Sequence, residues 1–109
     1  MKFSDLKFKP HPTHSNDGVQ ALHFFPNGYG VSIVKFPHSY GYEDGLYEIA
    51  VLEGNETEFE LCYDTPVADD VLGYLDEATV EDVLSSVSAL TKNQVKNYVE
   101  WRAEFHHDF

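Results

Sequence analysis

The sequence predicts one α+β domain: a four-stranded, mainly antiparallel sheet with two or three C-terminal helices packed on one of its faces. Three observations lead to this prediction. The chain of 109 residues fits a single domain. Its first part contains short apolar runs that turn-forming residues separate, and after about residue 65 the apolar period becomes helical. Strands followed by helices are typical of the α+β class.

The N-terminal residues 1–17 are expected to form an extended lead-in, and residues 18–109 the domain itself. Pro10 and Pro12 keep this lead-in out of a helix, and Asn16-Asp17-Gly18 ends it with a turn. The first and second strands, at about 19–25 and 29–36, flank the dipeptide Asn27-Gly28, which strongly indicates a hairpin. The third strand, at about 46–52, is apolar on both faces and is therefore expected to be central.

The fourth strand, at about 56–63, alternates with a period of two. Phe59 and Leu61 are expected to face the core. The other face, turned toward water, is expected to carry Glu56, Glu58 and Glu60. Cys62, the single cysteine of the chain, alternates with these residues but is expected to be half-buried as a small apolar residue.

Three helices are expected after the sheet. Thr65 suits an N-cap and Pro66 a first helical position, and apolar residues at helical spacing continue to residue 75. A second helix is expected at about 79–90. A third begins at Thr91, which forms a capping-box pattern with Gln94. It is expected to turn Val95, Tyr98, Val99 and Phe105 inward, and through Trp101 and Phe105 it could also support a homodimer.

Charge is the most unusual feature of the chain. Residues 36–91 contain 14 Asp or Glu and no Lys or Arg, and the net charge is −12. Direct binding to nucleic acid or to an anionic membrane is not expected, because both need a basic surface. A compact fold that keeps so many like charges loses stability by doing so. The acidic run therefore indicates a basic partner, although a merely solubilising surface would look the same.

Eleven residues are candidates for contact with that partner. Carboxylates spaced roughly 6.7 Å apart on a strand could imitate a phosphate track, so nucleic-acid mimicry is one form of the hypothesis. Tyr40 and Tyr42 lie in a glycine-containing loop of the kind that serves as a contact loop. The acidic candidates are Glu56, Glu58, Glu60, Asp69, Asp70, Asp76, Glu77, Glu81 and Asp82.

Catalytic, metal and cofactor sites are not expected. The six histidines lack the spacing of metal-binding motifs, and the acidic loop at 64–70 lacks the spacing of an EF-hand. Cys62 has no neighbouring base in its strand, and no serine lies in a nucleophile elbow. We therefore expect a protein that is not an enzyme. The alternative is a small-ligand or metal-binding protein that uses the tyrosine loop and the histidines.

Several segments together resemble a family of small, largely uncharacterised proteins of tailed bacteriophages. They include Asn27-Gly-Tyr-Gly-Val-Ser32, Gly45-Leu-Tyr-Glu-Ile-Ala-Val-Leu52 and Asp70-Val-Leu-Gly-Tyr-Leu75. The resemblance covers about residues 5–90 and implies no catalytic residue. It implies a phage product that acts in the host cytoplasm. By analogy with other small acidic phage proteins, which often inhibit host proteins by occupying a basic surface, we expect it to bind and inhibit a basic host protein, such as a nucleic-acid-binding or anti-phage defence factor. A minor virion component is a further alternative.

Overall fold

The computed structural model describes residues 1–106, and it describes side chains as far as residue 104. Strands precede helices along the chain, which confirms the α+β class. The elements are η1 (Phe3–Asp5), β1 (Lys9–Pro10), β2 (Val19–Phe24), β3 (Tyr29–Lys35), η2 (Tyr42–Asp44), β4 (Tyr47–Gly54), β5 (Phe59–Leu61), β6 (Leu72–Leu75), α1 (Glu77–Ser88) and α2 (Lys92–His106).

The described strands form one antiparallel sheet of six strands, two more than predicted. Its order is β1-β2-β3-β4-β5, and β6 also pairs with β4. β5 pairs with residues 52–54 at the end of β4, whereas β6 pairs with Tyr47 and Ile49 near its beginning. β4 therefore has neighbours on both edges, as its two apolar faces predict.

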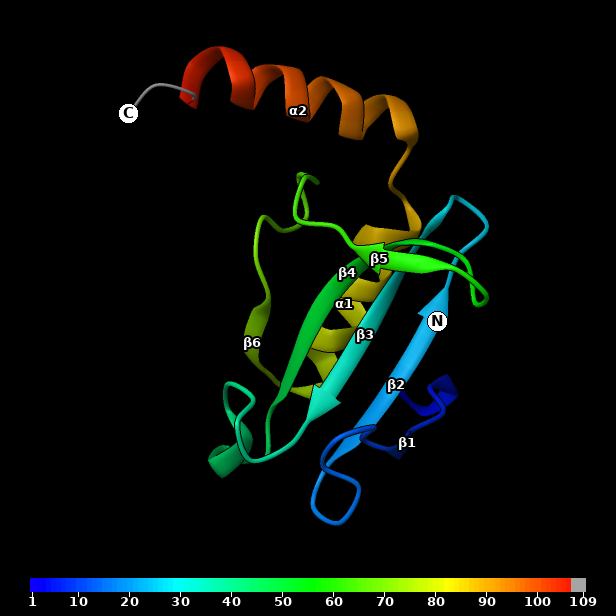
Figure 1. Cartoon of the computed structure of the whole chain (residues 1–109), viewed down its shortest axis with the longest axis vertical. Helices are drawn as coiled ribbons and strands as arrows, with labels where there is room; N and C mark the ends of the chain where they lie inside the picture. The colour runs from blue at the N-terminus through cyan, green and yellow to red at the C-terminus, as the bar shows by residue number, and fades with distance from the viewer. Residues whose placement is uncertain (107–109) are drawn as a thin grey trace.

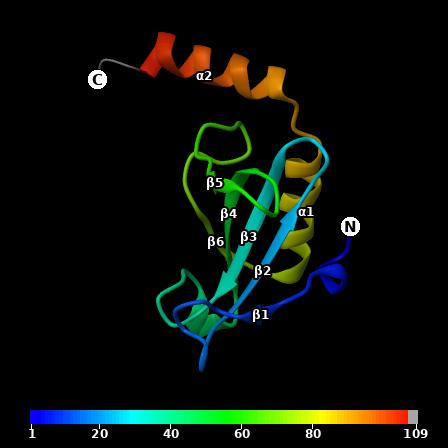
Figure 2. The ribbon, with the colours of Figure 1, turned by 45° about the vertical axis from the view of Figure 1, so that its right-hand side comes forward.

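One face of the sheet is covered by α1, which lies behind β3 and β4 in Figure 1 and beside them in Figure 2. The core forms between this helix and the sheet. Its buried members include Val31, Ile33, Ile49 and Val51 from the strands and Val80, Leu84 and Val87 from α1. The face toward the viewer in Figure 1 carries none of the helices that the structure describes.

α2 lies across the end of the sheet (Figure 1), and its side chains bond to β4 and to the loop after β5. Lys92 Nζ lies 2.8 Å from Glu53 Oε2, and Arg102 Nη1 donates to the Tyr63 carbonyl oxygen at 3.1 Å. The predicted capping box is confirmed, since the Thr91 and Gln94 side chains accept from each other's backbone N–H groups. The inward placement of Val99 is wrong, because 42% of its surface is exposed. The side chain of Phe105 lies outside the described residues.

The predicted helix at about 66–75 is wrong. Thr65 Oγ1 accepts hydrogen bonds from the N–H groups of Val67 and Ala68, as an N-cap would, but the chain makes only this turn. It then continues extended into β6. The reason is tertiary: β5 leaves the first half of β4 without a partner on that edge, and β6 supplies the backbone hydrogen bonds there.

The predicted fourth strand is shorter than expected, and neither of its faces is buried. β5 contains three residues, all exposed, with Phe59 at 43% and Leu61 at 56%, whereas Cys62, directly after the strand, is buried. The placement of Phe59 and Leu61 in the core is therefore wrong. The sheet curls strongly here, since the rings of Phe59 and Phe24 lie 5.2 Å apart although two strands separate β5 from β2.

The expected lead-in takes part in the fold. β1 pairs with β2, and Phe3, Leu6 and Phe8 pack against the core. The backbone N–H of Phe3 donates to the Glu81 carboxylate, which joins η1 to α1. Among the described helices, none is long and apolar enough to span a membrane.

Candidate partner-binding surface

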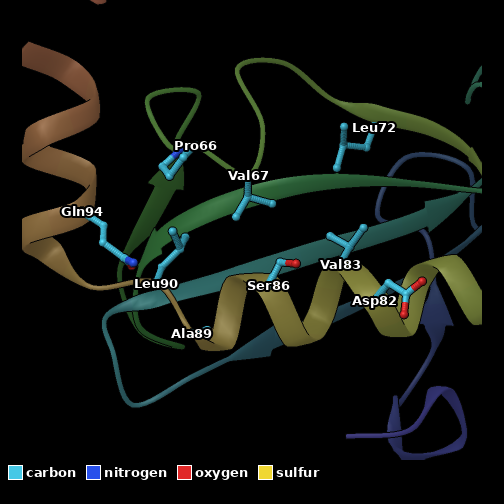
Figure 3. Close-up of a pocket in the computed structure, with 9 residues that line it drawn as sticks. All are labelled: Pro66, Val67, Leu72, Asp82, Val83, Ser86, Ala89, Leu90 and Gln94. Carbon is cyan, nitrogen blue, oxygen red and sulfur yellow. The ribbon is translucent and has the colours of Figure 1, made fainter. Parts of the chain in front are cut away.

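A groove of about 500 Å³ opens between α1 and the segment that precedes β6 (Figure 3). Val67 and Leu72 reach toward the helix from one wall, and Val83 and Leu90 reach back from the other. The remaining lining residues are Pro66, Asp82, Ser86, Ala89 and Gln94, the last of which comes from α2. Six of the nine lining residues are apolar, and the polar ones are Asp82, Ser86 and Gln94. A mostly apolar lining with a few polar groups is common in ligand and peptide sites.

The extended course of residues 66–72 creates this groove. Buried Thr65 fixes the turn through its bonds to the N–H groups of Val67 and Ala68, and this turn places Val67 at the wall. Leu72 follows as the first residue of β6, opposite Ile49 of β4. A helix over the same residues would have presented a different set of side chains to α1.

The helical period decides which side chains of α1 line the groove. Val80, Leu84 and Val87 point into the core, and Val83 and Ser86 lie about 100° away on the groove side. Asp76 caps the helix, accepting from the Thr79 N–H at 2.8 Å, and this hydrogen bond lowers the pKa of the Asp76 carboxyl.

The other end of α1 is held by Asn27, from the turn between β2 and β3. Its Nδ2 group donates to the carbonyl oxygens of Val87 and Leu90 at 2.8 and 2.9 Å and lies 3.2 Å from that of Ser88. Sequence reasoning assigned Asn27 only to the hairpin and missed this second role. No local signal could have revealed it, because its partners lie 60 residues or more further along the chain.

The structure divides the acidic candidates of the α1 side into two groups. Asp76 and Glu81 have structural partners, the Thr79 N–H and the Phe3 N–H respectively. Asp82 lines the groove, and Glu77 is exposed in the first turn of α1. Asp69 and Asp70 are exposed in the segment that forms the opposite wall, and Asp70 accepts from the Val71 N–H.

Glu56, Glu58 and Glu60 do not share one strand face, so that expectation is wrong. Glu56 and Glu58 lie in a turn, where the Asn55 side chain accepts the backbone N–H groups of residues 57 and 58. Asn55 prefers to bond its own backbone in this way, which ends the alternation before β5 begins. Glu60 alone is in β5, directly opposite Glu53 of β4.

Few of the carboxylates are neutralised by the chain itself. Within the described residues, the side-chain ion pairs are Lys92 with Glu53 and Arg102 with Asp64. Lys92 also lies 4.0 Å above the centre of the Tyr29 ring. Burial lowers the pKa of the Lys92 ammonium, but the hydrogen bond to Glu53 and the contact with Tyr29 outweigh it, and the net shift is upward.

The two tyrosine candidates are fixed by neighbours. The Tyr40 ring stacks on that of Tyr74 at 6.3 Å, and its backbone N–H donates to Glu48. The Tyr42 hydroxyl donates to the carbonyl oxygen of Asp17 at 3.4 Å. Tyr40 remains 56% exposed and lies next to Glu48. The structure does not bring these two residues to the groove.

Three histidines gather around Phe36. The rings of His11 and His14 lie 4.5 and 4.8 Å from it, and His38 lies 5.4 Å from His14. His11 Nδ1 accepts from the backbone N–H groups of residues 13 and 14. Across the part of the chain that the structure describes, no three His, Cys, Asp or Glu side chains are placed to hold a metal ion. The cluster is a packed set of rings.

Comparison of the chain with protein-family models, with curated proteins and with solved structures found no match.

Proposed function

We propose that this protein is a non-enzymatic binding protein whose acidic α1 side docks on a basic protein. One observation carries the proposal: within the described residues, this side combines an apolar groove with carboxylates that form no ion pair. Asp82 lines the groove, and Glu77 is exposed on the same helix. Asp69 and Asp70 are exposed in the segment that supplies the opposite wall. A basic partner would supply the missing counter-charges, and the groove would supply apolar contact.

The acidic groups persist at a cost in stability. Glu53 and Glu60 stand directly opposite each other across β4 and β5, and like charges in this position destabilise a sheet. Glu77 and Glu81 lie four residues apart on α1, where like charges cost a few tenths of a kcal/mol. Glu53 is paired with Lys92, and Glu81 accepts from the Phe3 N–H. On the α1 side it is therefore the exposed Glu77 whose position favours a partner-facing role.

The bacteriophage resemblance supplies a setting for this proposal. In that setting the partner is a basic host protein, a nucleic-acid-binding or defence factor, and the encounter takes place in the host cytoplasm. Mimicry of a regular phosphate track has less support than a general acidic surface, because Glu56 and Glu58 lie in a turn and only Glu60 lies in β5.

Capture of proteins from a bacterial lysate at two salt concentrations tests the proposal. The informative variant reverses the charge of Glu77 and Asp82 to lysine, which leaves the structural carboxylates Asp76 and Glu81 intact. The control reverses Glu43 and Asp44 in η2, with the same change in net charge. We expect basic proteins to be captured by the wild type and by the control, and to be lost with the α1 variant and at high salt.

Two results would overturn the proposal. One is capture that does not change with salt. The other is an equal loss of capture with the α1 variant and with the η2 control, because binding would then depend on the net charge of the protein and not on the α1 side. A rise in melting temperature with a nucleotide or a divalent metal would instead favour the small-ligand alternative, since a ligand that binds only the folded state stabilises it.

A further inference from the structure

We propose that the groove between α1 and residues 66–72 binds the apolar side of a basic amphipathic helix of the partner. This inference rests on the proposed function and specifies the part of the partner that makes contact. Three observations support it: the length and volume of the groove, the carboxylates in and near it, and the ion pairs that Lys92 and Arg102 already form.

The dimensions match a helix. The groove follows α1 from Asp82 to Ala89, a length of about 10 Å at 1.5 Å per residue. Two turns of a partner helix cover the same length and present apolar residues at i, i+3 or i+4, and i+7. The volume of about 500 Å³ has room for a few such side chains between Val67 and Leu72 on one wall and Val83 and Leu90 on the other.

The charges in and near the groove are acidic. Asp82 lines the groove at one end of the α1 wall. Asp69 and Asp70 do not line it, but they are exposed in the segment between Val67 and Leu72 of the opposite wall. No Lys or Arg lines the groove among the described residues. A helix with apolar anchors on one side and Lys or Arg beside them would therefore meet a complementary charge at Asp82 and others near the opposite wall, which gives specificity and a fast encounter.

Two of the cations of α2, Lys92 and Arg102, are already paired, with Glu53 and Asp64. A second copy of the chain would bring another net charge of −12 to the carboxylates in and near the groove. Like-charge repulsion therefore disfavours a second copy relative to a basic helix.

A synthetic peptide provides the probe: an 18-residue amphipathic helix of Leu and Lys, tested by calorimetry. Ser86→Phe fills the groove from its α1 wall. Ser85→Phe makes the same change one residue earlier, about 100° around the helix and outside the groove. We expect the wild type and Ser85→Phe to bind equally, and Ser86→Phe to bind at least about tenfold more weakly, as loss of a central contact does.

Equal binding by Ser86→Phe and Ser85→Phe overturns the groove inference. If that binding still weakens with salt, the acidic-surface function stands without the groove. A second measurement, hydrogen exchange of the wild type with the peptide, does not depend on the folding of any variant. We expect added protection in residues 83–90 and in residues 71–75. Protection confined to the end of the sheet around Glu53 and Glu60 would also overturn the groove.

Discussion

Replacing Glu60 by lysine should stabilise the protein. Glu60 faces Glu53 across β4 and β5, and Lys92 neutralises only Glu53. Carboxylates opposite each other are about 6 Å apart, so in water they repel by about 0.7 kcal/mol, and physiological salt halves this to about 0.3 kcal/mol. The reversal converts the repulsion into an attraction of similar size, less the new repulsion from Lys92.

The expected net gain is therefore about 0.3–0.6 kcal/mol, within the usual range for cross-strand pairs. For a domain of this size it corresponds to a rise in melting temperature of about 1–4 °C. Thermal unfolding followed by circular dichroism measures it, with Glu43→Lys in η2 as the control for net charge. The gain should shrink at high salt. A lower melting temperature for Glu60→Lys, or an equal rise for the control, would refute the reasoning.

Three further predictions concern other contacts. Asn27→Ala removes the side-chain bonds to the end of α1 and should cost about 2–3 kcal/mol in urea unfolding; an unchanged midpoint would contradict that role. The lowered pKa of Asp76 implies stability that is present above about pH 4 and lost as pH falls through its folded-state pKa. Asp76→Asn, which still caps α1, should therefore lose less stability in acid than the wild type; parallel pH profiles would argue against it. Burial raises the pKa of the Cys62 thiol, so a thiol reagent at pH 8 should react slowly with native protein and rapidly in denaturant; equal rates would contradict its burial.

Local signals in the sequence predicted several elements correctly. Asn27-Gly28 gives the hairpin between β2 and β3, with Gly28 at φ +89° as such a turn requires. The Thr91 capping box begins α2, and the apolar character of both faces of β4 matches its central position. Each of these depends on residues close together in sequence, so a short window contains the information.

Two predictions failed because their outcome depends on distant residues. Residues 67–75 have helical spacing, but β4 offers an unpaired edge that draws Leu72 and Leu75 into β6. The alternation at 56–63 is typical of a half-buried strand, but it does not show whether other elements cover that strand. All three residues of β5 are exposed, and Cys62 is buried only after the strand has ended.

The acidic run and the local elements are properties of the sequence by itself, because charge and short-range hydrogen bonding need no knowledge of the fold. Only the tertiary structure brings the residues of the candidate site together. Val67 and Val83 lie 16 residues apart and face each other only because β6 fills the edge of β4 while α1 covers the adjacent face of the sheet. The same arrangement gives Asp76 and Glu81 structural partners and leaves Glu77 and Asp82 exposed along α1.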